Sequence, residues 1–166
     1  SAQSWHAGLP GANMIVEGEN LPIEWGEDLN LAWTYEVEGD GWASPIVWGD
    51  KVFIASVVPV KINKPGEGEE AEGEGNQDLY LKDQYRWEIS CVDLASGNEL
   101  WKQVAYEGSP RTNKHARTNY ASETPVSDGK RVYVYFGMTG LFCYDMEGSL
   151  VWKKDLGAYN TIMNRL

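Results

Sequence analysis

Cysteine, basic residues and long apolar runs are scarce in this chain, and each shortage argues against one class of protein. There are only two cysteines in 166 residues, and a chain of this length can bury a core without disulfide or metal staples. The longest apolar run, residues 52–60, is interrupted by Ser56 and Pro59 and is far shorter than the about 20 residues of a membrane-spanning helix. We therefore predict a globular domain with no membrane span.

Basic side chains are outnumbered by acidic ones, 14 against 25, which gives a net charge of -11. A nucleic-acid backbone must be met by a basic stripe, so we expect no nucleic-acid partner. Much of the negative charge is local, because residues 66–78 carry six acidic side chains. The rest of the chain is only mildly acidic.

Tryptophan, tyrosine and glycine are plentiful, with eight, nine and eighteen copies. Aromatic residues favour strands and glycine favours tight turns, whereas no stretch shows helical periodicity. In residues 131–136, Val132 and Val134 fall on one face of a strand while Tyr133 and Tyr135 fall on the other. Both faces are apolar, as in a sheet stacked between two other sheets, so the predicted fold class is all-β.

A sequence motif is written twice in the chain. Residues 91–102 recur, one residue shorter, as residues 143–153, and the shared positions are Cys91 and Cys143, Asp93 and Asp145, Gly97 and Gly148, and Trp101 and Trp152. Each copy predicts a strand, a tight glycine turn and a second strand. Upstream, residues 44–54 resemble residues 124–134, so the repeat unit has four strands and indicates two blades of a β-propeller.

These repeats predict one partial β-propeller domain over residues 1–166. Its expected parts are an irregular leader at 1–30, a closing strand at 31–38, blade one at 44–106, blade two at 121–157 and the start of a further blade at 158–166. The strands of blade one are expected near 44–48, 51–58, 86–94 and 99–106, and those of blade two near 121–126, 131–137, 141–146 and 150–156.

Blade one contains an insert, residues 60–84, between its second and third strands. The insert is too charged and too rich in glycine to bury a core, so we expect a disordered, exposed loop. Its glutamates lack the ligand spacing of a calcium-binding loop, and we predict no metal site there.

Chain direction predicts that the two edges of the blades differ. In a four-stranded meander, the connections after the second and fourth strands leave from one edge, here called the loop edge; they are the insert and residues 107–120. The connections after the first and third strands leave from the opposite edge, here called the turn edge, and all four are tight turns, at residues 48–50, 95–97, 127–129 and 146–148. Binding loops are usually the longer ones.

The long connection after blade one holds the candidate binding residues, which are Arg111, Asn113, Lys114, His115, Arg117, Asn119 and Tyr120. Its cations suit the clamping of an anionic group, or of the acidic insert itself. Alternatively, the asparagine and arginine side chains only satisfy backbone groups of a long crossing between blades. The sequence leaves both interpretations open.

The repeated motif resembles the pyrroloquinoline-quinone-like (PQQ-like) β-propeller repeat. The runs at residues 21–25, 30–33 and 41–45 are similar to the amino-terminal opening of bacterial secreted members, which implies a periplasmic or extracellular protein. The resemblance also implies a ring of six to eight blades in which a tryptophan of each fourth strand docks on the glycine turn of a neighbouring blade. The residues assigned to this docking are Trp33, Trp101, Trp152, Gly97, Gly148, Asp93 and Asp145.

Two consequences follow for the cysteines and for the first strand. Cys91 and Cys143 would occupy equivalent positions on neighbouring blades, so we expect no disulfide between them and leave their redox state open. Residues 31–38, with Trp33, would complete the last blade of a closed ring. The missing blades are therefore expected in the same polypeptide or in other chains.

Quinone-dependent dehydrogenases of this family use an acidic base, a Ca²⁺ ion, an aromatic stack and, in some members, adjacent cysteines, and no such set can be assembled from this chain. We therefore expect a non-catalytic scaffold that binds protein or glycan, without catalytic residues, metal or cofactor. One alternative is the amino-terminal part of a PQQ-dependent alcohol or sugar dehydrogenase that binds PQQ and calcium. Another is a structural subunit whose propeller is completed by another chain, and whether the protein is an enzyme stays open.

Overall fold

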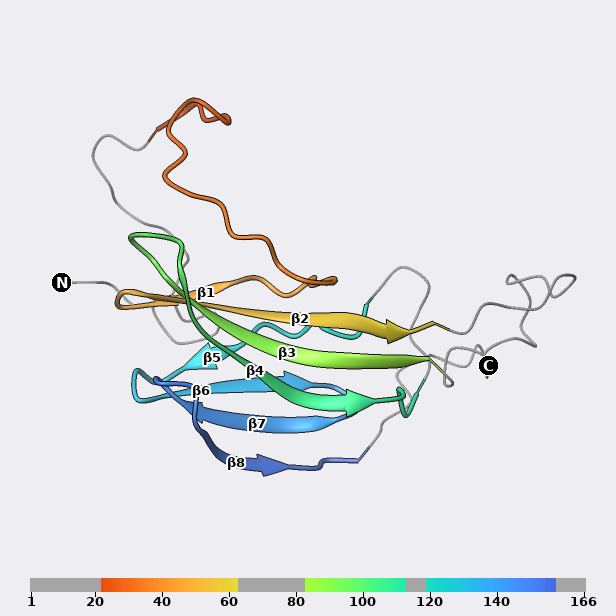
Figure 1. The fold of residues 1–166 in the computed structure, drawn as a ribbon. Coiled ribbons are helices and arrows are strands. Elements are labelled where there is room, and N and C mark those ends of the chain that lie inside the picture. The colour runs from red at the N-terminus through yellow and green to blue at the C-terminus, as the bar shows by residue number, and fades with distance from the viewer. Residues whose placement is uncertain (1–21, 63–82, 113–118, 158–166) are drawn as a thin grey trace, which may run out of the picture.

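The computed structural model describes residues 22–62, 83–112 and 119–157, and all regular structure in these ranges is β (Figure 1). Two four-stranded antiparallel sheets follow each other along the chain, with strand orders β1-β2-β3-β4 and β5-β6-β7-β8. Within each sheet, every strand pairs with the next one in sequence, as expected for meandering blades. In the described ranges, no helix could serve as a membrane span.

Each blade has four strands in the order expected from the repeat. Blade one consists of β1 (Ile46–Trp48), β2 (Lys51–Lys61), β3 (Gln84–Asp93) and β4 (Glu99–Gly108). Blade two consists of β5 (Val126–Ser127), β6 (Arg131–Phe136), β7 (Gly140–Asp145) and β8 (Leu150–Lys154). Strands β2 and β3 extend to Lys61 and from Gln84, so both ends of the expected insert are strand. Its residues 63–82 lie outside the described ranges.

The strand expected at residues 31–38 is absent from the structure, although these residues are described. A strand forms only where a second strand satisfies its backbone groups, and no strand of the two described sheets pairs with these residues. The first backbone pairing in this region comes later, between Asp40 and Val57.

The first strand of blade two is shorter than expected. We expected a strand at 121–126, but β5 has only two residues. The backbone amides of Trp42 and Ala43 both donate to the carbonyl of Ala121, at 3.0 and 3.1 Å. The segments before β1 and β5 are thus bonded to each other instead of lengthening their own sheets.

The hydrophobic core lies between the two sheets. Phe53 and Trp87 of blade one pack in one cluster with Val132 and Val134 of blade two, and all four side chains are fully buried. The indole nitrogen of Trp87 donates to the carbonyl of Tyr120 at 2.9 Å, which satisfies the one polar atom of that ring. Each tryptophan buried in this way stabilises the fold by roughly 2–3 kcal/mol.

The repeated motif occupies equivalent positions in the two sheets. Cys91 pairs with Trp101 in blade one, and Cys143 pairs with Trp152 in blade two. Both thiols are free and buried, and burial raises the pKa of Cys91 to about 12.

Two tryptophans lie flat on glycine turns, and the contacts are nearly identical. A Cβ atom added to Gly97 would lie 2.6 Å from Trp33 Cδ2, and one added to Gly148 would lie 2.6 Å from Trp101 Cδ2. The indole nitrogen of Trp33 donates to the carbonyl of Leu94 at 2.9 Å, and that of Trp101 donates to the carbonyl of Met146 at 3.0 Å. Leu94 and Met146 each directly follow the aspartate of the motif.

A third contact of this kind was not expected from the sequence. Trp48, at the end of β1, covers Gly129 in the turn between β5 and β6, where a Cβ atom would lie 2.3 Å from the ring. Gly49 is the equivalent glycine of blade one, and a Cβ atom there would meet nothing within 4 Å.

The carboxylates of the turn aspartates accept hydrogen bonds from backbone amides. Asp145 Oδ1 accepts from the amide of Ser149 at 2.7 Å, and Asp93 Oδ1 accepts from the amide of Ser96 at 2.7 Å. The Ser96 hydroxyl also donates to Asp93 Oδ1, at 2.6 Å. The pKa of Asp93 lies below its ordinary value mainly because of this hydroxyl and then because of the amide, and the pKa of Asp145 is lowered mainly by the amide of Ser149. The same holds for Asp128, which accepts from the amides of Lys130 and Arg131.

We predict that Gly148→Ala destabilises the protein more than Gly49→Ala. Both glycines have positive φ, 89° and 61°, so both variants carry backbone strain, and the strain is larger at Gly148. Only the alanine at position 148 would collide with an indole ring, which should cost about 1–3 kcal/mol more free energy of unfolding. Urea titrations of the two variants measure this difference, and equal losses would contradict the tryptophan contact.

We also predict that the turn aspartates make the free energy of unfolding fall as the pH is lowered into the acid range. Their pKa values are lower in the folded chain than the about 3.9 of an unfolded aspartate, so their contribution is complete above that pH and is lost as the pH falls through the folded value. Asp145→Asn keeps the acceptor oxygen and removes the charge. Urea unfolding at a series of pH values below neutrality should show a shallower loss for the variant, and identical slopes would argue against this role.

Candidate functional site

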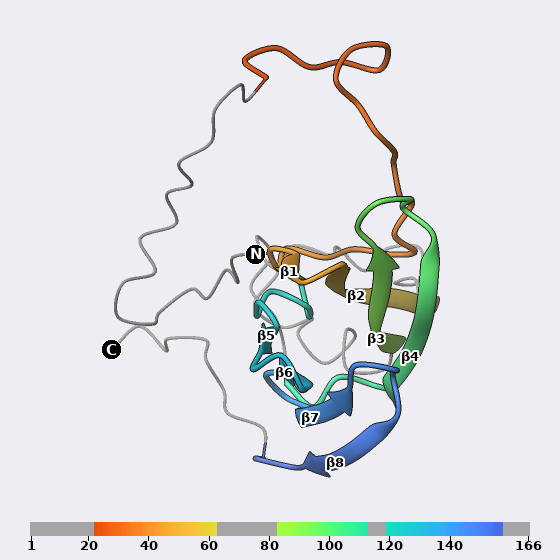
Figure 2. The same cartoon turned by 90° about the vertical axis from the view of Figure 1, so that its left-hand side faces the viewer.

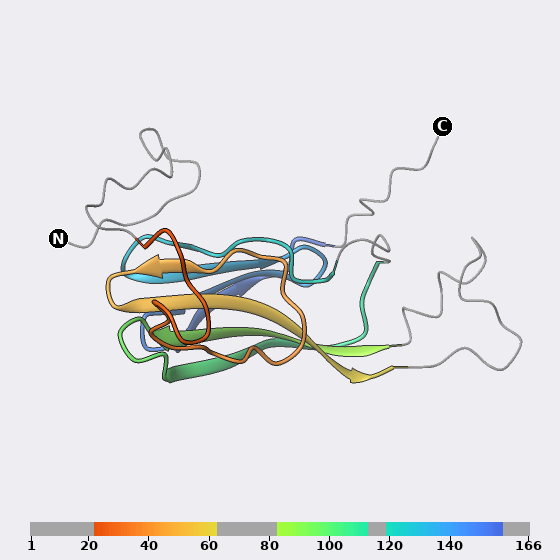
Figure 3. The same cartoon turned by 90° about the horizontal axis from the view of Figure 1, so that it is seen from above.

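The loop edge and the turn edge are distinct in the structure. Figure 3 shows the tight turns gathered at one end of the strands, whereas β2 and β4 end at the other. The turn between β6 and β7, which is the counterpart of the acidic insert, is also at the loop edge and spans only residues 137–139. Blade one therefore carries the long connections, and blade two carries a short one.

The candidate binding residues divide into two groups. Asn113, Lys114, His115 and Arg117 lie outside the described ranges. Arg111, Asn119 and Tyr120 are described, and they stand at the two ends of the segment that connects the blades.

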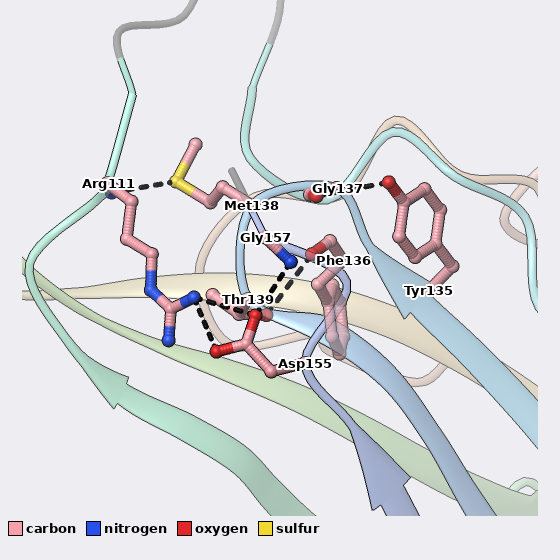
Figure 4. A network of polar contacts seen from close by, with 8 residues as sticks. All are labelled: Arg111, Tyr135, Phe136, Gly137, Met138, Thr139, Asp155 and Gly157. Carbon is pink, nitrogen blue, oxygen red and sulfur yellow. Dashed lines mark hydrogen bonds and ion pairs between the residues drawn. The ribbon is translucent and has the colours of Figure 1, made fainter. Parts of the chain in front are cut away.

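Arg111 lies just after β4 and is engaged with blade two (Figure 4). Its Nη1 atom contacts both carboxylate oxygens of Asp155, at 2.8 and 2.7 Å, and its backbone amide donates to the sulfur of Met138 at 3.2 Å. Asp155 directly follows β8, and Met138 lies in the turn between β6 and β7. Arg111 thus joins the end of blade one to two separate elements of blade two.

The turn that holds Met138 is closed by its own hydrogen bonds. The amide of Thr139 donates to the carbonyl of Phe136 at 2.7 Å, and the Tyr135 hydroxyl donates to the carbonyl of Gly137 at 3.0 Å. These bonds position Met138 toward Arg111 (Figure 4).

The carboxylate of Asp155 has two kinds of partner. The backbone amide of Gly157 donates to its Oδ1 atom at 2.9 Å, and Arg111 supplies the positive charge, so the pKa of Asp155 lies below its ordinary value. Asp155 and Arg111 remain more than a third exposed, so water screens the pair and its contribution to stability is small. An exposed ion pair can exchange one partner for a ligand at little cost.

Asn119 and Tyr120 face inward at the other end of the connection. Asn119 Oδ1 accepts from the amide of Ala121 at 3.0 Å, while its Nδ2 atom is buried and has no partner in the described structure. Tyr120 is 5% exposed and packs in the core cluster beside Trp87. Of the described candidates, only Arg111 presents a functional group to solvent.

No sequence pattern indicated that Asp155 or Met138 would lie next to Arg111. These residues come from another blade and belong to no motif, so their proximity depends on how the two sheets pack. No cluster of three or more histidine, cysteine or acidic side chains that could hold a metal ion occurs in the residues described.

Residues 84–163 match a PQQ-type family model described as outer membrane protein assembly factor BamB, a range that includes β3, β4 and all of blade two. No curated protein gave a significant match. The matched range contains both copies of the cysteine, aspartate, glycine and tryptophan motif. Residues 84–163 are therefore similar to the PQQ-like repeat family.

Proposed function

We propose that this chain is a non-catalytic scaffold module of the β-propeller type that binds a partner at its loop edge, in the periplasm or outside the cell. The observation that carries the proposal is the asymmetry of the edges. The long connections leave the edge where β2 and β4 end, and the opposite edge has only tight turns. A rigid sheet that presents long loops at one edge is a common arrangement for binding.

A protein is the partner that we favour, and a glycan is the alternative. The matched family model is described as an assembly factor, a role that depends on contacts with other proteins. At the loop edge, Val60 and Ile62 at the end of β2 are about half exposed, and the exposed ion pair of Arg111 and Asp155 follows β4 and β8 at the same edge. An edge with both exposed apolar side chains and exchangeable charges suits a protein partner better than a sugar.

We further propose that residues 31–38 supply the outer strand of a blade that precedes blade one in a closed ring. The support is that Trp33 contacts Gly97 and Leu94 in the way that Trp101, on the outer strand β4, contacts Gly148 and Met146. The remaining strands of that blade would come from the same polypeptide or from another chain.

Site-specific photo-crosslinking in the source bacterium tests the scaffold proposal. A crosslinking amino acid is placed at Ile62 or Glu107, near the loop edge, and at Lys130 or Glu147, on the turn edge. All four side chains are exposed in the structure, so the two pairs are matched in accessibility. We expect adducts with one protein from the loop-edge positions only.

Two results would overturn the proposal. Adducts of equal yield from both edges would show that the loop edge has no special role. Dye reduction by the full-length protein that requires both PQQ and Ca²⁺ would instead establish the dehydrogenase alternative.

The pair of Arg111 and Asp155 allows a second prediction. Arg111→Ala removes the guanidinium group, whereas Asp155→Ala removes its partner and leaves that group free for a ligand. We expect the first variant to lower the crosslinking yield at Glu107 and the second to raise it. If both variants lower the yield equally, the pair acts only as a contact between blades.

A further inference from the structure

Residues 31–38 contact blade one through side chains and not through strand pairing. Their burial alternates, because Trp33, Tyr35 and Val37 are half-buried while the residues between them are exposed. Trp33 covers the turn between β3 and β4, where Figure 2 shows the segment in orange. The Tyr35 hydroxyl donates to Glu99 at the start of β4. The segment therefore lies along blade one as an extended chain that is held at separate points.

A further point of attachment is a chain of charges on β3. Arg86 Nη2 donates to Glu38 at 3.0 Å, and Arg86 Nε donates to Glu88 Oε1 at 2.8 Å. Glu88 is 2% exposed, and its Oε2 atom is buried without a hydrogen-bond partner in the described structure. A buried carboxylate that is only half satisfied lowers stability. Its evident contribution is to fix the guanidinium group of Arg86 with Nη2 directed at Glu38.

Three positions on β2 and β3 differ in chemistry from their counterparts on β6 and β7. By the shared register of the two sheets, the counterparts are Ser56 and Phe136, Glu88 and Gly140, and Ser90 and Phe142. The two phenylalanines belong to the core between the blades, whereas the three residues of blade one are buried and polar. Blade two thus meets blade one through an apolar face, while the corresponding face of blade one is polar.

The charged groups that hold the segment are open to water. The side chains of Arg86 and Glu38 are 31% and 55% exposed. Lys102 and Glu99, 29% and 39% exposed, form a second pair at 3.4 Å where Glu99 receives Tyr35. Water and dissolved salt screen such pairs, so each contributes little to stability. The attachment of residues 31–38 is therefore weaker than the apolar core, and its strength depends on ionic strength.

We propose that the contact between residues 31–38 and blade one, here called the seam, is where the closed ring opens before the contact between blades one and two does. Glu88 is a positioning residue of the seam, because it acts on the segment through Arg86. The polar face tolerates water when the segment leaves, whereas an apolar face would not. This inference rests on the proposal that residues 31–38 close the ring, and it adds which contact gives way first.

Hydrogen/deuterium exchange of the full-length protein, read by mass spectrometry, tests the seam. Peptides that cover residues 31–38 are compared with peptides from β6 and β7 at constant pH. The comparison is made at about 0.1 and about 1 M NaCl, between which the Debye length falls from about 10 to about 3 Å. We expect residues 31–38 to exchange at least about tenfold faster than β6 and β7, and the higher salt to accelerate only the former. Equal exchange in both regions, or acceleration of both, would overturn the proposal.

Glu38→Gln and Asp155→Asn form a matched pair of variants. Glu38 and Asp155 are 55% and 56% exposed, and each is paired with one arginine, but only Glu38 belongs to the seam. We expect Glu38→Gln to speed the exchange of residues 31–38 by about two- to fivefold at low salt, the effect of one exposed ion pair, and to reduce the effect of salt. Asp155→Asn should leave that segment unchanged. The same acceleration from both variants would refute the seam.

Glu88→Gln separates positioning from a purely structural role. The variant keeps the shape of the side chain and an oxygen for Arg86, but it removes the charge that fixes the guanidinium group. We expect faster exchange of residues 31–38, and no further increase on combination with Glu38→Gln, because both changes act through Arg86. If Glu88→Gln speeds the exchange of β6 and β7 as much as that of the segment, Glu88 only supports the fold and its assigned role is wrong.

The same measurement separates the seam from ring closure itself. If residues 31–38 of the unaltered full-length protein exchange as fast as an unstructured chain, they do not close the ring, and both proposals fail. If they are protected as strongly as β6 and β7 at both salt concentrations, ring closure holds and only the seam is refuted.

Discussion

The structure depends on one kind of contact, an indole ring laid flat on a glycine at the turn of the next sheet. The glycine is required for two reasons, since its φ is positive and since a Cβ atom would penetrate the ring. The ring in turn needs an acceptor for its nitrogen, and the turn supplies a carbonyl. The aspartate that shapes the turn directly precedes the residue with that carbonyl, so the aspartate, glycine and tryptophan of the repeated motif form one physical unit.

The strands and their order could be predicted because their causes are local. Alternating side chains and glycine turns recur in both copies, and the two four-stranded sheets follow from them. Residues 31–38 form no strand in the described structure because strand formation needs a partner, which periodicity within a segment does not reveal. The short β5 has a similar cause, since Ala121 bonds to Trp42 of the other blade.

The candidate site was predictable only in its position. Chain direction places the long connections on one edge, and this required no knowledge of packing. The engagement of Arg111 with Asp155 and Met138 depends on how the two sheets approach each other, and no repeat relates these residues. The inward placement of Tyr120 likewise depends on Trp87, whose nitrogen needs its carbonyl.

The contact between Trp48 and Gly129 has a consequence for how such a protein can change. Together with Trp101 on Gly148, it fixes the two blades to each other at two separate points, both at turns on the same edge. Two points of attachment at the turn edge prevent rotation of one sheet against the other, whatever sequence forms the connections at the loop edge. Loops at that edge can therefore lengthen, shorten or change charge while the angle between the sheets stays the same, which separates the evolution of binding from that of assembly.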